Sequence, residues 1–182
     1  MAASAISKIP ARAGRSGLVN VVIDTPRGSR NKYKFDPALG LFRVSRVLPP
    51  GMSFPHDFGS VPGTRAQDGD PLDVLVLAAA PTFAGCLVTV RLIGMLRAQQ
   101  VENGKRVRND RLIGVIETPV NRAAITQLSE LGTDELSGIE EFFVSYNRAQ
   151  GRPFRVTGRL GAHAAEQALE RAMRAFRRIR PD

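Results

Sequence analysis

The 182-residue sequence contains one cysteine, no tryptophan and only two tyrosines. Because Cys86 has no second cysteine to pair with, the chain cannot form an intrachain disulfide, which is compatible with a reducing compartment such as the cytoplasm. The shortage of aromatic residues argues against a surface that stacks the bases of single-stranded nucleic acid. No apolar run approaches the length that spans a membrane, so we expect no membrane partner.

Acidic residues are absent from positions 1–17, which are rich in Ala, Ser, Arg and Gly. We expect this segment to be a flexible basic arm, and residues 18–182 to form a single domain with a sizeable core. The arm lacks the apolar segment of a secretory signal. Over the whole chain, 26 Lys and Arg exceed 17 Asp and Glu, which gives a net charge of +9 and favours an anionic partner such as a phosphate compound or nucleic acid.

The first two thirds of the chain have the pattern of short strands. We predict strands at residues 18–24, 32–35, 41–47, 72–80, 86–96 and 111–117, with a hairpin turn at 103–104. Residues 54–64 hold two prolines and two glycines and predict a structured loop. Apolar residues at helical spacing then predict helices at 121–131, 136–148 and 162–179, with a short strand at 154–158. The pattern indicates an α+β protein, mainly β, built on a small barrel.

Residues 67–74 read Gln-Asp-Gly-Asp-Pro-Leu-Asp-Val, so three carboxylates, those of Asp68, Asp70 and Asp73, fall within six positions beside an apolar strand. Gly69 and Pro71 favour a turn there. Like charges this close repel unless a cation lies between them, and carboxylate oxygens at this density suit Mg²⁺ or Mn²⁺. A solvated turn is the better explanation of Asp68 and Asp70 taken alone, but it does not require Asp73 beside a hydrophobic strand.

Phosphoryl transfer at such a site needs cationic groups that contact the phosphate oxygens. Lys32, Arg46 and Arg111 lie on or beside predicted strands, where they could face one cavity, although each taken alone is better explained as a surface cation. Tyr146 ends an apolar stripe of the predicted 136–148 helix and could direct its hydroxyl away from the core.

The stretch Asp68-Gly69-Asp70-Pro71-Leu72-Asp73 resembles the signature of the family I soluble inorganic pyrophosphatases. The resemblance runs from about residue 21 to residue 158 and includes Asn31-Lys32-Tyr33, Leu41-Phe42 leading to Arg46, Phe54-Pro55 with Phe58-Gly59, and Phe142-Phe143 with Tyr146. It implies a small five-stranded OB-like closed barrel with flanking helices and hydrolysis of pyrophosphate to two phosphates with Mg²⁺ as the required metal. It also implies a homo-oligomer, since bacterial members are commonly hexamers.

Carried over by position, the resemblance assigns roles to single residues. Asp70 would accept the proton of the attacking water, and Asp68 and Asp73 would bind metal ions. Asp110 would be a further metal ligand only if its strand is shifted or bulged, because the matching position is Asn109. The remaining roles would fall to Lys32, Arg46, Arg111 and Tyr146 as groups that bind phosphate, and to Asp24 as an acidic residue at the edge of the site.

The chain also departs from the family pattern. Lys34 replaces a glutamate, Phe54 and Phe58 replace tyrosines, and Asn147 replaces a lysine for which Arg148 could substitute. An earlier acidic ligand of the hairpin would fall near Gln99, Gln100 or Glu102. These departures leave open how many metal ions bind. They also leave an alternative function, that of an impaired relative that binds phosphate or a partner protein. The basic net charge and the barrel-like strand pattern leave a further alternative, an OB-type protein that binds nucleic acid.

Overall fold

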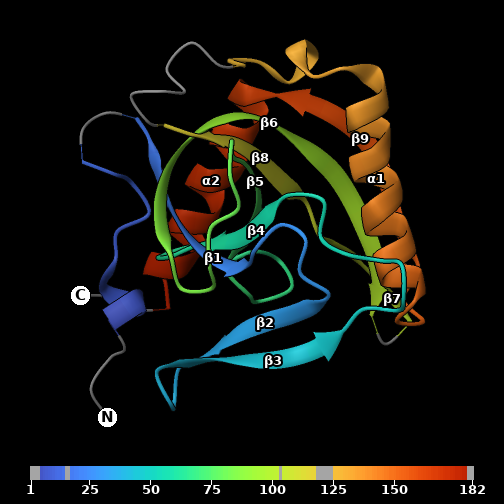
Figure 1. The fold of residues 1–182 in the computed structure, drawn as a ribbon. Coiled ribbons are helices and arrows are strands. Elements are labelled where there is room, and N and C mark those ends of the chain that lie inside the picture. The colour runs from blue at the N-terminus through green and yellow to red at the C-terminus, as the bar shows by residue number, and fades with distance from the viewer. Residues whose placement is uncertain (1–4, 15–16, 103, 118–124, 180–182) are drawn as a thin grey trace.

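The computed structural model describes residues 5–14, 17–102, 104–117 and 125–179 (Figure 1). In chain order its elements are η1 (Ala5–Lys8), β1 (Val19–Thr25), β2 (Asn31–Asp36), β3 (Leu41–Val47), β4 (Asp57–Val61), β5 (Leu72–Leu77), β6 (Leu87–Glu102), β7 (Lys105–Arg108), β8 (Arg111–Ile116), η2 (Leu128–Glu130), α1 (Thr133–Arg148), β9 (Phe154–Gly161) and α2 (Ala162–Arg177).

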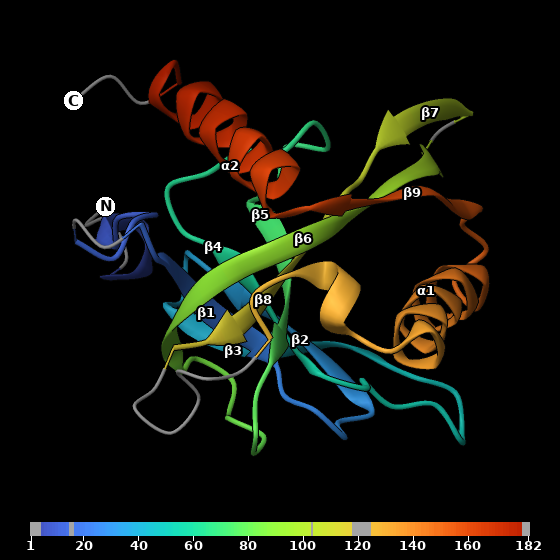
Figure 2. The ribbon, with the colours of Figure 1, turned by 90° about the horizontal axis from the view of Figure 1, so that it is seen from above.

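Five strands pair in the order β1–β4–β5–β8–β6, and β1 also pairs with β6, so that the strands close into a ring. The β5–β8 pair is parallel and the other four pairs are antiparallel. Beyond the ring, β6 continues as a 16-residue strand that also pairs with β7 and β9 (Figure 2). The predicted mainly-β fold, with a five-stranded OB-like ring and flanking helices, is therefore confirmed.

The two faces of the ring strands pack against different helices, because successive side chains of a strand point to opposite faces. On β5, Val74 and Val76 belong to the cluster that contains Leu169 of α2. Leu75, between them, belongs to the cluster that contains Phe143 of α1. This arrangement makes β5 a strand buried on both faces, which explains its nearly continuous apolar sequence.

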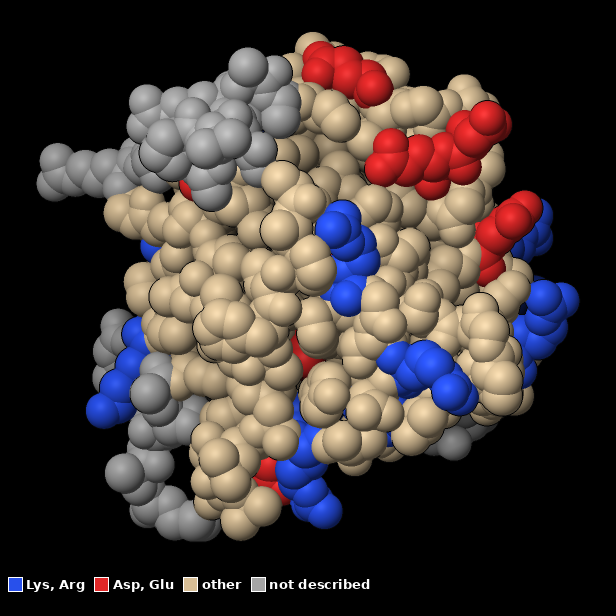
Figure 3. Space-filling view, in the orientation of Figure 1, with Lys and Arg blue, Asp and Glu red and all other residues tan. Residues whose placement is uncertain are grey.

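The β2–β3 hairpin forms a separate two-stranded sheet beside the ring (Figure 1). Its register sets Lys32 opposite Arg46 and Lys34 opposite Arg43, and the register shifts between Lys32 and Tyr33. On the face drawn in Figure 3, basic side chains lie around this hairpin and acidic side chains lie over the α1 side. Two basic residues of the hairpin, Lys32 and Lys34, line the cavity beside the ring.

Two predictions of secondary structure were wrong. Residues 54–64 are not only a loop, because β4 forms a strand between Pro55 and Pro62 with β1 on one side and β5 on the other. The predicted helix at 121–131 lies partly outside the described residues, and its described part holds only the 3₁₀ turn η2. In addition, β6 and β9 run further than the predicted strands, to Glu102 and Gly161. They pair with each other between Gly94–Gln100 and Phe154–Gly161, and the end of β6 pairs with β7 up to Glu102.

The segment before β1 makes specific contacts with α2. Ala11 is buried, and the Arg12 guanidinium forms ion pairs with Glu166 at 2.6 Å and with Glu170 at 3.0 Å. The division into a flexible arm and a single domain stays a prediction. Among the described residues, no helix has both the length and the apolar character needed to cross a membrane.

Candidate active site

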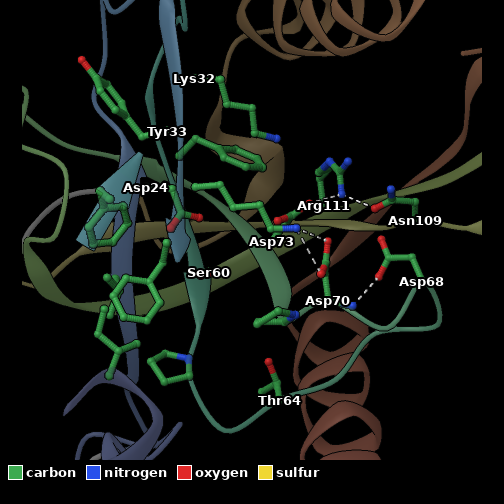
Figure 4. Close-up of a pocket in the computed structure, with 18 of the residues that line it drawn as sticks. Asp24, Lys32, Tyr33, Ser60, Thr64, Asp68, Asp70, Asp73, Asn109 and Arg111 are labelled. Carbon is green, nitrogen blue, oxygen red and sulfur yellow. Dashed lines mark hydrogen bonds and ion pairs between the residues drawn. The ribbon is translucent and has the colours of Figure 1, made fainter. Parts of the chain in front are cut away.

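A pocket of about 420 Å³ opens between the β2–β3 hairpin, the ring strands and the end of α1. Figure 4 shows the acidic side chains of the β4–β5 loop and Arg111 pointing into the same space, with Asp24 and Lys32 on its other side. The predicted site residues that line the pocket are Asp24, Lys32, Asp68, Asp70, Asp73, Arg111 and Tyr146. Segments far apart in the sequence therefore meet at one cavity.

The β4–β5 loop that carries the acidic stretch is held from its base by Thr64, which is buried. The Thr64 hydroxyl donates to the Val61 carbonyl at 2.6 Å and accepts the Leu72 backbone N–H at 3.0 Å. Because the first residue of β5 and the last residue of β4 are joined through one side chain, the loop between them has a fixed base.

At the tip of the loop, the Asp68 carboxylate accepts the Asp70 backbone N–H at 3.2 Å. Gly69 lies between them with φ +90°, a conformation that side-chain-bearing residues rarely adopt. The Ala66 N–H also donates to the Asp70 carbonyl at 2.8 Å. This tight turn sets both carboxylates at the mouth of the pocket, and Asp73 follows on β5, opposite Ser60.

Two carboxyls of the pocket, those of Asp24 and Asp68, have a raised pKa. Burial, and then the charge of Asp73, raise the pKa of Asp24 to about 7, against the lowering effect of Lys32, a hydrogen bond with Ser60 and Lys34. Burial, and then Asp73, also raise the pKa of Asp68. Both shifts arise first from burial and second from the charge of Asp73, and a bound cation relieves both by stabilising the ionised carboxylates.

Arg111 is the buried cation of the pocket. Its guanidinium lies 2.5 Å from the Asp73 carboxylate and donates to the Asn109 side-chain oxygen, and only 7% of the Arg111 side chain is exposed. Its Cζ also lies 5.4–5.9 Å from the ring centres of Phe58, Phe143 and Phe154. These contacts fix the guanidinium plane at the pocket wall.

The Nε atom of Arg111 is buried and has no hydrogen-bond partner among the described residues. Buried hydrogen-bond donors nearly always have an acceptor in the protein, in water or in a ligand. The unpaired Nε–H of Arg111 at this pocket therefore indicates that a ligand accepts its hydrogen bond. An anion with several oxygens, such as a phosphate, provides acceptors of that kind.

Lys32 approaches the pocket from β2. Its ammonium lies 5.4 Å from the ring centres of both Phe58 and Tyr146. Phe58, which lacks the hydroxyl of a tyrosine, therefore still helps to position this cation through its ring face. Tyr146 is largely buried beneath it, at 7% exposure.

Two predicted site residues do not join this pocket. Arg46 is exposed and faces Lys32 across the hairpin, but it is not among the residues that line the cavity. Asp110 is turned away, since its carboxylate accepts the Ala98 backbone N–H at 3.1 Å and pairs with Arg108 at 2.5 Å. The neighbouring Asn109 lines the pocket in its place, as the alternation of side chains at a strand requires.

Other lining residues carry no role predicted from the sequence. Lys34 donates to the Asp70 carboxylate, with Nζ 3.1 Å from Oδ2. Its position was detectable, because Lys32 and Lys34 are two apart on a strand and so share a face. The carboxamides of Gln100, Asn147 and Gln150 were not detectable as a group, since they come from β6, α1 and the turn after α1.

The donor chemistry of the pocket fits a hard divalent cation, because its acidic side chains offer only carboxylate oxygens. In the described part of the chain, however, no three His, Cys, Asp or Glu side chains already converge closely enough to enclose a metal ion. Asp70 is engaged by Lys34 and Asp73 by Arg111. A cation that binds here must therefore compete with cations of the protein itself.

Comparisons with known proteins agree with this site and fold. The family model described as inorganic pyrophosphatase matches residues 21–177, so the chain belongs to the inorganic pyrophosphatase family, whose members are hydrolases of phosphoric anhydrides. The inorganic pyrophosphatase of Synechocystis sp. is 34% identical over 172 residues, which cover 94% of this chain and 99% of that protein. That of Thermus thermophilus is 37% identical over 144 residues, or 78% of this chain and 80% of that protein.

Solved structures give the same result. The crystal structure of the Thermus thermophilus inorganic pyrophosphatase superposes with a TM-score of 0.85 at 31% identity, covering 94% of this chain and 98% of that chain. The structure of the Coxiella burnetii inorganic pyrophosphatase gives 0.83 at 32% identity, covering 92% and 99%. The family resemblance inferred from the acidic stretch is confirmed.

Proposed function

We propose that this protein hydrolyses inorganic pyrophosphate to two phosphates in a reaction that requires Mg²⁺, with Mn²⁺ as a substitute. The proposal rests on the composition of one pocket. Carboxylates from β1, the β4–β5 loop and β5 line it together with Lys32 and with Arg111, whose buried Nε–H has no hydrogen-bond partner among the described residues. Oxygen ligands for a divalent cation and donors for phosphate oxygens thus lie within one cavity.

In this proposal Asp68 and Asp73 hold the metal, with Asp24 close by. A bound Mg²⁺ supplies positive charge against the phosphate oxygens and Lewis acidity toward water. Lys32 and Arg111 hold oxygens of the diphosphate, which keeps the phosphorus aligned and stabilises the charge that spreads over its oxygens in the transition state.

The proposed step is attack of one water on one phosphorus. The new P–O bond forms as the bond from that phosphorus to the bridging oxygen breaks, and the second phosphate leaves with the bond's electron pair. Asp70, whose carboxylate accepts a hydrogen bond from the Lys34 ammonium, takes a proton from the attacking water. The Tyr146 hydroxyl and Lys32 then hold the product phosphate.

Phosphate release from pyrophosphate tests this proposal. With Mg²⁺ present we expect turnover by the wild type, loss of turnover in chelator, and a roughly 10²–10⁴-fold loss in Asp70→Asn, because the substitution removes a general base without removing bulk. Asp134→Asn, the same change at an exposed position in the first turn of α1, serves as the control and should keep full activity. Full activity in Asp70→Asn would contradict the assigned base.

A second candidate function is phosphate binding without turnover. It is favoured by the ion pair that occupies Asp70 and by the amides of Asn109 and Asn147 where the family pattern has charged groups. Wild-type protein that binds phosphate by calorimetry but releases none from pyrophosphate, with either Mg²⁺ or Mn²⁺, would establish this candidate instead. Oligomeric state and a cytoplasmic location stay predictions.

A further inference from the structure

One cation already lies on the acidic turn. The Lys34 ammonium is 3.1 Å from Oδ2 and 3.4 Å from Oδ1 of Asp70, so it straddles both carboxylate oxygens. Both side chains are largely exposed, at 64% and 62%, and the pair spans from β2 to the β4–β5 loop. An exposed ion pair of this kind is weak and opens readily.

Among the described residues, acidic and basic side chains line the pocket in equal number, although the raised pKa of Asp24 leaves its carboxyl partly protonated near neutral pH. Four carboxylates, those of Asp24, Asp68, Asp70 and Asp73, face the same cavity as four cations, those of Lys32, Lys34, Arg111 and Arg152. Two of the three acidic residues of the β4–β5 stretch are held directly by such cations, Asp70 by Lys34 and Asp73 by Arg111. The wall on the side of β6 and β8 adds uncharged amides, those of Gln100 and Asn109.

A divalent ion at a carboxylate cluster has two tasks, to neutralise charge and to bind substrate oxygens. At Asp70 the first task is performed by an ammonium of the protein, which is mobile enough to donate to a phosphate oxygen as well. The same ammonium contributes to lowering the pKa of Asp24, so its field reaches beyond Asp70.

We propose that Lys34 is a built-in counter-cation of this site, which takes the charge-neutralising place of one divalent ion at Asp70. The inference rests on the proposed function, because it concerns how many divalent ions that function uses. With Lys34 in place, the substrate-free site therefore binds fewer divalent ions, and binds them more weakly, than the same four carboxylates would without the Lys34 charge.

The test is direct titration of Mn²⁺ into metal-free, full-length protein, with free Mn²⁺ followed by electron paramagnetic resonance. Since removing a partly exposed charge changes an interaction by about 1 kcal/mol or less per ion pair, Lys34→Gln should bind Mn²⁺ roughly two- to fivefold more tightly than wild type. Lys34→Glu, which adds a ligand, should bind at least one additional ion. Lys34→Arg should resemble wild type, because it keeps the charge.

Lys105→Gln is the matched control, because it removes one positive charge from an exposed position on β7 away from the pocket. It should leave the titration unchanged. Equal or weaker Mn²⁺ binding by Lys34→Gln, an unchanged ion count in Lys34→Glu, or an equal gain in Lys105→Gln would overturn the inference.

The titration contains no pyrophosphate, so its result does not depend on turnover. Tighter Mn²⁺ binding by Lys34→Gln in a protein that releases no phosphate would uphold the counter-cation and overturn the proposed hydrolysis. Turnover by wild type with no change in Mn²⁺ binding by Lys34→Gln would do the reverse.

Discussion

Asp24 shows how the fold changes the chemistry of a single residue. Its carboxyl comes from a ring strand whose other side chains are mostly buried, and it faces Asp73 across the pocket. Burial and that neighbouring charge raise its pKa from 3.8 to about 7, so in the metal-free protein it holds its proton near neutral pH. A group of this kind opposes folding when it is ionised, and a divalent cation or a neighbouring lysine offsets that cost.

The shift predicts a pH-dependent stability with a defined sign. Between pH 4 and 7 the folded protein keeps the Asp24 proton while the unfolded chain has lost it, so the contribution of Asp24 to the free energy of unfolding falls as pH rises. We therefore expect metal-free Asp24→Asn to gain stability relative to wild type from pH 4 to pH 8, by at most about 4 kcal/mol. Urea unfolding in chelator at several pH values measures it, and a pH-independent difference would contradict it.

At the scale of elements, β4 is central to the ring, because it joins β1 to β5 and leads into the acidic loop. It crosses β1 so closely that a Cβ built on Gly59 would lie 2.3 Å from the Val22 carbonyl oxygen. Neither neighbour can retreat easily, since β1 is also paired with β6 and β5 with β8. The glycine that made this segment look like a loop is thus what permits the strand to fit.

Gly59→Ala should therefore destabilise the protein strongly. We expect a loss of about 3 kcal/mol in the free energy of unfolding, because two paired strands must separate to admit one methyl group. Gly158→Ala on β9, where no atom lies within 4 Å of the added carbon, is the control and should change stability by less than about 0.5 kcal/mol or improve it slightly. Equal losses in the two variants, measured by urea unfolding, would show that the close crossing has no energetic consequence.

At the scale of the whole molecule, the candidate metal site exists only in the folded chain, since β1 and the β4–β5 loop meet through the closed ring. A cation that binds the folded state and not the unfolded chain must raise the melting temperature. Ion binding thus reports on the assembled pocket independently of any catalysis.

We expect Mg²⁺ or Mn²⁺ at about ten times its dissociation constant to raise the melting temperature by about 3–6 °C over protein in chelator. Asp73→Asn should lose most of this rise, because the substitution removes an anionic ligand. NaCl at matched ionic strength controls for screening. A rise that is the same with NaCl, or unchanged in Asp73→Asn, would place the stabilising ions elsewhere on the protein.

Much of this protein was determined by local sequence. The acidic stretch, the β2–β3 hairpin around residues 36–40, the buried run of β5 and the apolar stripe of α1 are all visible as patterns, because each depends on the spacing of side chains along one element. The pattern of short strands indicated a small barrel, and the resemblance to the family added that five strands form it.

Other features depend on contacts between distant residues, which the spacing of side chains along the sequence does not show. Pairing on both edges made β4 a strand despite its flanking prolines, and side-chain alternation at the start of β8 turned Asn109 into the pocket and Asp110 out of it. Packing of the β2–β3 hairpin beside the β4–β5 loop brought the Lys34 ammonium onto the Asp70 carboxylate. Such contacts join residues distant in the chain, so only the three-dimensional fold fixes which charges meet in the pocket.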